Sequence, residues 1–238
     1  MRLTQRNGVT AYDVASRYDD AYFADLAARY RERNRFARQR LANVSSLLPP
    51  LPGRKLLDLG SGMGTFAVEA AKSGAFAVGI DLAPAALTAA QRVAESERAL
   101  VSLIRADGAQ LPIRSRSVDV VLAADLTEHL DDVTLGRVLR EARRVLRPAG
   151  VLVLYTPNRE HIFEKLRERG MLKDGDPSHI GMRSEKELVD AVSAAGLRVT
   201  AVRHLPSHVP AWNVLERGLG RWVPLLRRRI GLVAKEAG

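Results

Sequence analysis

The sequence predicts an α/β fold in which a doubly wound, mostly parallel sheet carries helices on both faces. Short apolar segments alternate with segments of helical periodicity along most of the 238 residues, as in parallel strands joined by helices. The segment KLLDLGSGMGTF at 55–66 joins an apolar strand to a helical pattern through three glycines. An isolated acid, Asp81, closes the next apolar run. Sheets of this kind hold ligands at such strand ends.

The strands and the helices between them can be placed from apolar runs and helix signals. A helix begins at Pro84, since proline suits the first helical position, and others begin at Met63 and near Val133. Ser184 and Glu187 have the spacing of a capping box, which starts a further helix. The seven strands are predicted at 55–60, 76–82, 100–106, 118–124, 151–156, 197–205 and 229–235. For the last of these an amphipathic helix is the alternative.

Two helical segments flank the predicted core. The first runs to the Pro49–Pro50 pair, and its aromatic side chains predict one or two helices that cover the ligand or pack on the sheet edge. The second precedes the last strand and is expected to be a substrate lid or a membrane-facing patch. Its large apolar side chains share one helical face: Trp212, Leu215, Leu219 and Trp222. We therefore expect a helical cap at 1–50 and a core at 51–238, with a helical insertion at about 206–226.

Composition limits the class of protein. The chain contains no cysteine, which excludes disulfides and thiolate catalysis. Its amino terminus has no apolar signal segment, and no run of about 18 apolar residues occurs, so we expect a cytoplasmic protein. The net charge of +10 suits nucleic acid or anionic lipid, but the arginines are spread over most helices. The densest cluster is Arg227, Arg228 and Arg229, so peripheral contact with the inner face of a membrane through 206–229 is an alternative.

The glycine turn also indicates the kind of ligand. Glycine lets the backbone approach a ligand closely because no side chain intervenes. A dinucleotide-binding turn would carry its third glycine at position 65, where this chain has Thr65, so NAD is disfavoured. The pattern DxGxGxG from Asp58, followed by Asp81, resembles the first motifs of class I S-adenosylmethionine-dependent methyltransferases. Later motifs of that family are resembled, in order, by RADGA at 105–109, VDVVLAADLTEHL at 118–130 and RVLRPAGVLVLYT at 144–156.

The resemblance covers about 55–197 and is strongest to the type 11 group, which includes ubiquinone-biosynthesis O-methyltransferases. It implies a Rossmann-like, seven-stranded sheet in which strand seven is antiparallel, and it implies S-adenosylmethionine as the cofactor. In this family the acid after strand two holds the ribose and the acid after strand three holds the adenine. The residues that the resemblance assigns to the cofactor are Asp58, Gly60, Ser61, Gly62, Asp81, Leu82, Asp107, Gly108 and Ala124.

The candidate catalytic residues follow from what methyl transfer to a hydroxyl requires. The enzyme must align the reactants and remove a proton, but it needs no covalent nucleophile. Proton acceptors should follow strands four and five, because ligands lie at the carboxyl ends of such strands. His129 follows strand four, and Asn158 and His161 follow strand five, so these three are the catalytic candidates. A structural histidine at a strand end is the alternative for His129.

A metal site is the second candidate chemistry for the same region. Asp125, Glu128 and His129 have a DxxEH spacing that brings oxygen and nitrogen ligands together if the turn is helical, and His179 lies in the loop before the capping box. The segment resembles an ExxEH motif of ubiquinone O-methyltransferases and of methyltransferases that act on small-RNA 3′ ends. The ligands of the latter group map onto these four residues, although the shorter Asp125 departs from the motif. The metal would be Mg²⁺ or Zn²⁺; carboxylates that orient a neighbour are the alternative.

We therefore expect an O-methyltransferase that acts on a small-molecule or lipid-like acceptor. Methylation of RNA at a 2′-oxygen and a catalytically silent, cofactor-binding scaffold are the alternative functions. An apolar tunnel under Trp212 and Trp222 would favour a hydrophobic acceptor, whereas a continuous basic groove leading to Asp125 and His129 would favour RNA. The sequence contains no recognisable RNA-binding module, so nucleic acid is the less favoured partner.

Overall fold

A computed structural model describes residues 20–173, 175–207, 210–219 and 222–237. The first 19 residues of the predicted cap and the side chain of Trp212 lie outside this description. Within the described ranges, no helix combines the length and the apolar character needed to cross a membrane.

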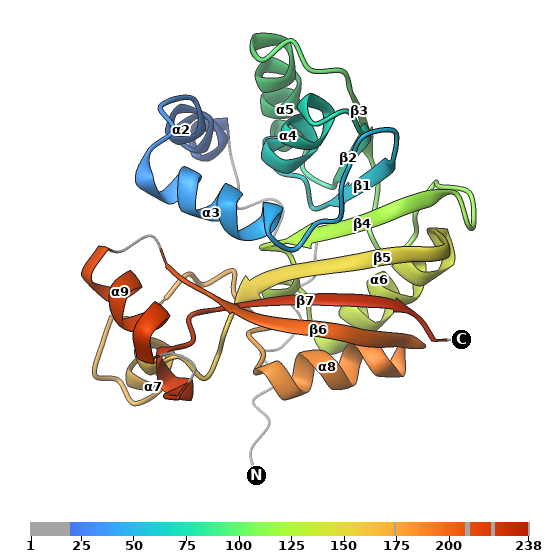
Figure 1. Ribbon diagram of the computed structural model, residues 1–238. Coiled ribbons are helices and arrows are strands. Elements are labelled where there is room, and N and C mark those ends of the chain that lie inside the picture. The colour runs from blue at the N-terminus through green and yellow to red at the C-terminus, as the bar shows by residue number, and fades with distance from the viewer. Residues whose placement is uncertain (1–19, 174, 208–209, 220–221, 238) are drawn as a thin grey trace.

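A seven-stranded sheet forms the centre of the described chain (Figure 1). Its strands are β1 (Lys55–Leu59), β2 (Phe76–Asp81), β3 (Val101–Arg105), β4 (Val118–Ala124), β5 (Leu146–Pro157), β6 (Leu197–Leu205) and β7 (Arg229–Glu236). They lie in the order β3-β2-β1-β4-β5-β7-β6, and every neighbouring pair is parallel except the two pairs that β7 makes. The predicted doubly wound fold with an antiparallel strand seven is confirmed, and the last segment is a strand rather than an amphipathic helix.

Helices cover both faces of this sheet. They are α2 (Asp20–Arg31), α3 (Arg35–Ser45), α4 (Thr65–Lys72), α5 (Pro84–Ser96), α6 (Asp132–Val145), α7 (Ile162–Glu168), α8 (Glu185–Ala194) and α9 (Pro210–Leu219), with short 3-10 turns η1 (Thr127–His129) and η2 (Pro224–Leu226). Alternate residues of β4 face opposite sides. Val121 and Ala123 belong to the core that α6 and α8 cover, whereas Val120 and Leu122 belong to the core that α3 and α4 cover. The central strands are therefore buried on both faces.

Two element boundaries differ from the prediction by more than one residue, and each has a local cause. Helix α4 begins at Thr65 rather than at 63, because Gly62 and Gly64 adopt φ angles of 53° and 77° and cannot be helical there. Strand β5 begins at Leu146 rather than at 151, because Leu146 pairs with Val118 ahead of an irregularity in the register. The predicted capping box at the start of α8 is present.

The two amino-terminal helices pack on the core and also border the ligand cavity. On α2, Phe23, Ala27 and Tyr30 are buried against α4 and α5. The hydroxyl of Tyr30 donates a hydrogen bond to Glu69 on α4. The edge of α2 that carries Tyr22 lines the cavity. The described part of this segment therefore packs on α4 and α5 and borders the cavity, and its role as a cover for the ligand stays a prediction.

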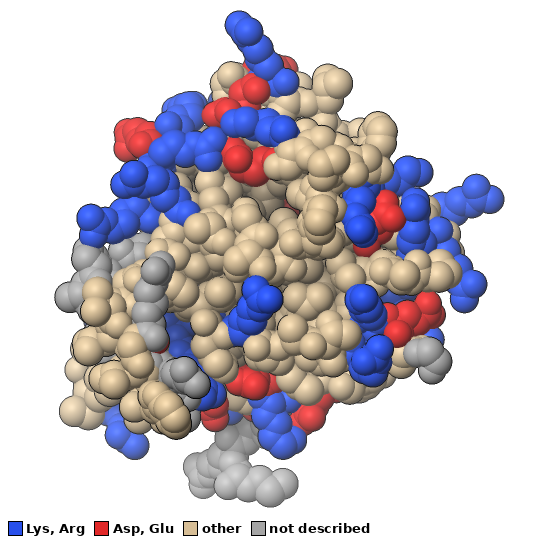
Figure 2. Space-filling model, viewed as in Figure 1, with Lys and Arg blue, Asp and Glu red and all other residues tan. Residues whose placement is uncertain are grey.

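The insertion between β6 and β7 exposes an apolar surface, at the lower left of Figures 1 and 2. We call it the α9–η2 patch, and its members are Val214, Leu215, Leu219, Trp222, Val223 and Leu225, all exposed. Trp222 is 73% exposed and does not line the cavity, so its side chain does not roof an apolar tunnel of the kind considered from the sequence.

The three arginines that follow the α9–η2 patch do not form the exposed basic cluster expected from the sequence. Arg229 turns inward, and its Nη1 lies 2.5 Å from Oδ1 of Asp125. The guanidinium of Arg228 lies over the ring of Phe163, 5.8 Å from its centroid. Arg227 lies 3.9 Å from a carboxylate oxygen of Glu185. The expectation that this cluster faces lipid stays a prediction, although these contacts engage all three guanidinium groups.

Candidate active site

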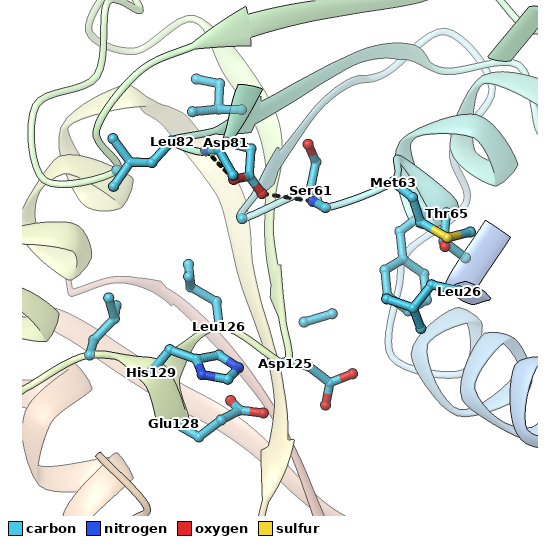
Figure 3. Close-up of a pocket in the computed structure, with 18 of the residues that line it drawn as sticks. Leu26, Ser61, Met63, Thr65, Asp81, Leu82, Asp125, Leu126, Glu128 and His129 are labelled. Carbon is cyan, nitrogen blue, oxygen red and sulfur yellow. Dashed lines mark hydrogen bonds between the residues drawn. The ribbon is translucent and has the colours of Figure 1, made fainter. Parts of the chain in front are cut away.

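A cavity of about 340 Å³ opens at the carboxyl ends of β1, β2 and β4 (Figure 3). It lies beside the point where the strand order reverses from β1 to β4, which is where doubly wound sheets bind ligands. The glycine turn and Asp81 line one end, and the residues that follow β4 line the other. Helices α2 and α3 supply an apolar wall made of Tyr22, Phe23, Leu26 and Phe36.

Backbone forms the cavity surface at the glycine turn after β1. Gly60, Gly62 and Gly64 have φ angles of 64°, 53° and 77°, which residues with side chains rarely adopt. A Cβ on Gly60 would lie 2.8 Å from Cδ1 of Leu126, so a side chain here would require Leu126 to shift. The hydroxyl of Ser61 is buried and has no hydrogen-bond partner among the described residues. This hydroxyl faces β2, since a Cβ on Gly79 would lie 2.9 Å from its Oγ.

Asp81 presents a carboxylate that backbone amides hold in place. Its Oδ2 accepts a hydrogen bond from the amide of Gly62 at 2.8 Å, and its Oδ1 accepts one from the amide of Ala83 at 2.9 Å (Figure 3). Burial raises the pKa of Asp81 above its ordinary value, although these hydrogen bonds lower it. Each carboxylate oxygen can accept a further hydrogen bond, so Asp81 can hold two hydroxyl groups of a ribose.

The turn after β3 completes this end of the cavity. Oδ1 of Asp107 accepts a hydrogen bond from the amide of Ala109 at 2.8 Å, which fixes the carboxylate as an acceptor for an amino group. Leu82 and Ala106 add apolar contacts beside it. Together with the carboxylate of Asp81 and the open glycine turn, these residues fit S-adenosylmethionine. The predicted cofactor residues that line the cavity are Gly60, Ser61, Gly62, Asp81, Leu82, Asp107, Gly108 and Ala124.

Asp58 is the predicted cofactor residue that does not reach the cavity. It is buried on β1, and its Oδ2 accepts a hydrogen bond from the amide of Ala67 at 3.2 Å. Burial raises the pKa of Asp58 to about 7, although Arg40 and the Ala67 amide lower it. Asp58 therefore stabilises the start of α4, on the side of the glycine turn that faces away from the cavity.

At the other end of the cavity, Asp125 is clamped by two arginines. Its Oδ2 accepts a hydrogen bond from Nε of Arg40 on α3 at 2.6 Å, and its Oδ1 accepts one from Nη1 of Arg229 on β7 at 2.5 Å. Burial raises the pKa of Asp125, but the two guanidinium groups outweigh burial and lower it overall. Its φ angle of 55° is unusual for a residue with a side chain. Asp125 does not belong to the group of predicted ligands whose donor atoms lie within 4.8 Å of one another, so the predicted four-residue ligand set is not formed.

The other three predicted ligands do come together. One ligand atom each of Glu128, His129 and His179 can be chosen so that all lie within 4.8 Å of one another, and we call these residues the acceptor-end cluster. Glu128 and His129 lie on the turn η1, whereas His179 comes from the loop before α8. The rings of His129 and His179 meet edge to face with centroids 5.0 Å apart. This set offers one oxygen and two nitrogen donors, which suits a divalent metal.

Electrostatics favour the neutral forms of two members of the acceptor-end cluster, Glu128 and His179. Burial and the charge of Asp125 raise the pKa of Glu128, whose Oε2 accepts a hydrogen bond from the hydroxyl of Thr156 at 3.0 Å. Burial and His129 lower the pKa of His179 to about 4. Nδ1 of His129 lies 3.2 Å from the carbonyl oxygen of Ser178. A carbonyl can only accept, so Nδ1 carries a hydrogen, and in the neutral imidazole the lone pair then lies on Nε2.

Asn158 and His161 lie outside the cavity, contrary to their assignment as catalytic candidates. Nδ2 of Asn158 donates to the carbonyl of Arg227 at 2.7 Å, and its Oδ1 accepts from the amide of Glu160 at 3.0 Å. His161 caps α7, since its Nδ1 accepts from the amide of Phe163 at 3.3 Å. Burial and nearby arginines lower the pKa of His161 to about 4. Both side chains shape the loop after β5.

Several residues of the cavity were not predicted from the sequence. Arg40 and Arg229 lie 85 and 104 positions from the carboxylate that they bind, so no local pattern relates them. Asp176 lines the cavity and accepts hydrogen bonds from the amide and the hydroxyl of Ser178. Its proximity to His179 in the sequence is the one signal that pointed to it. Tyr22 belongs to the aromatic series already assigned to the cap.

Residues 57–154 match the family described as "Methyltransferase domain". This segment contains the glycine turn, Asp81 and the turn η1. Residues 57–154 form a methyltransferase domain. The cofactor that the domain implies is S-adenosylmethionine, which the cavity residues fit.

Named relatives align with parts of the chain around the methyltransferase domain. A ubiquinone biosynthesis O-methyltransferase from Azorhizobium caulinodans is 36% identical over 112 residues, which are 47% of this chain and 44% of that protein. A demethylmenaquinone methyltransferase from Corynebacterium glutamicum is 34% identical over 146 residues, which are 60% of this chain and 59% of that protein. The chain thus aligns with about half the length of these relatives.

Solved structures share the fold of the methyltransferase domain at lower identity. An S-adenosylmethionine-dependent methyltransferase from Mesorhizobium loti has a TM-score of 0.62 at 19% identity, with 83% of this chain and 98% of that chain covered. Geranyl diphosphate C-methyltransferase from Streptomyces coelicolor has a TM-score of 0.64 at 18% identity, with 84% and 79% covered. These likenesses establish the fold.

Proposed function

We propose that this protein transfers a methyl group from S-adenosylmethionine to an oxygen atom of a small-molecule or lipid-like acceptor. The observation that carries the proposal is that one cavity contains both the fixed carboxylate of Asp81 and the acceptor-end cluster. A cofactor held at the first end would face proton-accepting groups at the second. Bound S-adenosylmethionine supplies an electrophilic methyl group on a positively charged sulfur.

The residues at the cofactor end bind and orient. The open backbone at Gly60 and Gly62 admits the amino-acid part, Asp81 accepts hydrogen bonds from the ribose hydroxyls, and Asp107 accepts from the adenine amino group. Phe23 closes the cavity on the α2 side, since a Cβ on Gly62 would lie 3.7 Å from its ring. This ring narrows the cavity beside the glycine turn.

At the acceptor end we propose that His129 receives the acceptor proton on Nε2. The contact of its Nδ1 with the Ser178 carbonyl supports this role because it selects the required tautomer. The same cluster fits a divalent metal, which would be held by Glu128, His129 and His179. Such a metal would act as a Lewis acid and lower the pKa of the acceptor hydroxyl.

The chemical class of the acceptor is supported by the cavity wall and by the relatives. The wall contributed by α2 and α3 is aromatic and aliphatic, which suits an apolar or ring-containing molecule. Relatives with about one third identity are named for methylation in ubiquinone and menaquinone biosynthesis. We therefore propose a hydroxylated, partly apolar acceptor of this general kind.

The first experiment identifies the acceptor and then separates the two chemistries. Lysate fractions of the native host are incubated with methyl-labelled cofactor, and labelled products are identified by mass spectrometry. The rate is then measured with and without chelator in the wild type and in His129→Ala. If His129 takes the proton, chelator has no effect, and the variant loses about 10²-fold in turnover with cofactor affinity retained. If a metal acts, chelator abolishes transfer and Mg²⁺ or Zn²⁺ restores it. Absence of any labelled product would support the silent scaffold.

RNA methylation at a 2′-oxygen is a second candidate, because a surface rich in Lys and Arg lies beside the cavity. Figure 2 shows Lys and Arg side chains gathered over the region of α2 and α3, at the upper left. Arg31, Arg35 and Arg38 are exposed there, on the helices that also wall the cavity. Incorporation of label into RNase-sensitive material, weakened steeply by salt, would favour this function over the small-molecule reading.

We also propose a peripheral membrane contact through the α9–η2 patch. Its six exposed apolar side chains support it, whereas the inward turn of Arg229 removes charge that was expected to help. Binding to vesicles should therefore depend only weakly on salt. Sedimentation with neutral and anionic liposomes tests this. Protein that stays in the supernatant with both would leave the α9–η2 patch without a lipid partner.

A further inference from the structure

The acceptor-end cluster joins two segments that are far apart in the chain. Glu128 and His129 lie on η1, directly after β4, and His179 lies in the loop before α8, about fifty positions later. Their relative position must therefore be fixed by contacts between the segments. One such contact joins two backbones, since the amide of Gly181 donates to the carbonyl of Glu128 at 2.8 Å. In a second contact, Nδ1 of the His129 side chain lies against the carbonyl of Ser178.

Arg183 supplies most of the remaining contacts between the two segments. Its Nη1 donates to the carbonyls of Thr127 and Gly181, both at 2.7 Å, and its Nη2 donates to the carbonyl of Leu130 at 2.8 Å. Nε and Nη2 also donate to Oδ1 of Asp132, at 3.1 and 2.7 Å. One guanidinium thus binds both ends of the η1 turn and the loop that carries His179.

The loop approaches the η1 turn so closely that a side chain would not fit between them. A Cβ on Gly181 would lie 1.9 Å from the carbonyl oxygen of Leu130 and 2.9 Å from Nη1 of Arg183. Glycine at this position therefore lets the two backbones meet. Arg183 then fills the space behind the contact.

The environment of Arg183 indicates that its role is geometric. Its side chain is 6% exposed, whereas that of its one acidic partner, Asp132, is 92% exposed. An ion pair with so exposed a carboxylate compensates little of the cost of burying the cation. The backbone carbonyls must therefore compensate most of the cost of burying the cation. Their directions match the planar, forked set of donors of a guanidinium group, and the single ammonium group of lysine cannot reproduce that geometry.

We propose that Arg183 is a positioning residue that locks the η1 turn to the loop carrying His179 and so assembles the acceptor-end cluster. The inference rests on the proposed function only for its effect on turnover. Its effect on the loop can be measured without an acceptor.

The experiment compares Arg183→Ala and Arg183→Lys with the wild type. The amide of Gly181 is expected to exchange its hydrogen at least about tenfold faster in both variants, because the loop separates from η1. The amide of Gly64, which donates to Ser61 in the glycine turn, is expected to exchange at the wild-type rate. With an acceptor in hand, turnover should fall by about 10²-fold while the dissociation constant of the cofactor changes less than about twofold.

Arg144→Ala is the matched control. Arg144 also makes five hydrogen bonds through its guanidinium, to the carbonyls of Leu111 and Ile113, to Ser115 and to Glu141. Neither Arg144 nor these partners line the cavity. The control should lower the melting temperature without changing the exchange of Gly181 or the turnover.

The outcomes separate this proposal from the proposed function. Unchanged exchange at Gly181 in both Arg183 variants would overturn the positioning role, and so would full turnover in Arg183→Lys. If the alanine variant does not fold, the lysine variant alone decides. If the wild type transfers no methyl group while Gly181 still exchanges faster in the variants, the proposed function fails and the positioning role stands.

Discussion

Two carboxylates at the ends of the neighbouring strands β1 and β4, the buried Asp58 and the half-buried Asp125, are stabilised in opposite ways. Asp58 accepts one backbone hydrogen bond and has no ion pair among the described residues, so burial dominates and its pKa rises to about 7. Asp125 has an arginine on each oxygen, so the two cations outweigh burial and its pKa falls. The same chemical group is therefore neutralised by a proton at one site and by charge pairing at the other.

This difference extends to the two ends of the cavity. The cofactor end is built by backbone groups within short turns, such as the amides of Gly62 and Ala83 that hold Asp81. The acceptor end is built by side chains from α3, η1, the loop before α8 and β7. The first arrangement depends on local conformation and the second on tertiary structure. Variants can test each dependence separately.

Asp58→Asn should raise the free energy of unfolding relative to the wild type, and this gain should grow as pH rises. A folded-state pKa raised from 3.8 to about 7 means that the folded protein holds this proton more tightly than the unfolded chain does. Stability from this group is therefore full below about pH 4 and is lost as pH rises to 7, by up to about 4 kcal/mol. The variant avoids that loss. Urea unfolding of both proteins at pH 4 and pH 8 checks it, and an equal pH dependence in the two would contradict it.

Asp125→Asn should destabilise the protein by about 3 kcal/mol at pH 7, because Arg40 and Arg229 lose their shared counter-ion. Asparagine tolerates the positive φ of this position, so the substitution changes mainly the charge. The folded pKa lies below 3.8, so the difference from the wild type should vanish as pH falls through it.

Asp190→Asn is the control for this substitution, since the Lys186–Asp190 pair is exposed and should contribute nothing measurable. Thermal or urea unfolding of both variants provides the comparison. A loss in Asp125→Asn no larger than in the control would show that the arginine clamp does not stabilise the acceptor end.

Asp81→Ala should weaken cofactor binding by about 2 kcal/mol or more, which is roughly 30-fold, because two charge-assisted hydrogen bonds to the ribose are lost. Isothermal titration with S-adenosylmethionine and S-adenosylhomocysteine measures this, with Asp190→Asn again as the control. Unchanged affinity in the variant, or tight binding of NAD by the wild type, would remove Asp81 from the cofactor site.

Gly60→Ala should destabilise the protein more than Gly170→Ala does, by about 1 kcal/mol. The two glycines have similar positive φ angles, 64° and 69°, so both substitutions carry the same backbone strain. At Gly170 nothing lies within 4 Å of the new Cβ, whereas at Gly60 the side chain of Leu126 lies 2.8 Å away. Equal losses in unfolding experiments would mean that Leu126 moves aside and that the glycine turn is less tightly held than the contacts indicate.

The cofactor end could be predicted from the sequence because its determinants are consecutive residues. Glycines at fixed spacing and an acid after the second strand specify a turn whose geometry varies little. Asp58 belongs to the same pattern, yet its side chain faces the interior, and only the register of β1 against its neighbours decides that. The sequence pattern thus located the ends of the strands. The direction in which an individual side chain points became known only from the folded sheet.

The acceptor end could be predicted only in part. The DxxEH spacing located Glu128 and His129, and proximity to the capping box located His179. Asp125 was grouped with them because spacing does not reveal competing partners, and its partners come from α3 and β7. Arg183 carries no motif at all. Arg183 acts by donating hydrogen bonds to several backbone carbonyl groups, and the directions of these groups are known only from the folded chain.

The position of Phe23 has a kinetic consequence. This ring lies on the glycine turn, while the rest of its helix is anchored by Ala27 and Tyr30 in the core. We expect that release of the demethylated cofactor requires α2 to swing away from the turn and to break part of that anchoring. Turnover would then be limited by how often the helix opens, a gating step that is set by the packing of α2 on α5 and not by the chemistry of the acceptor.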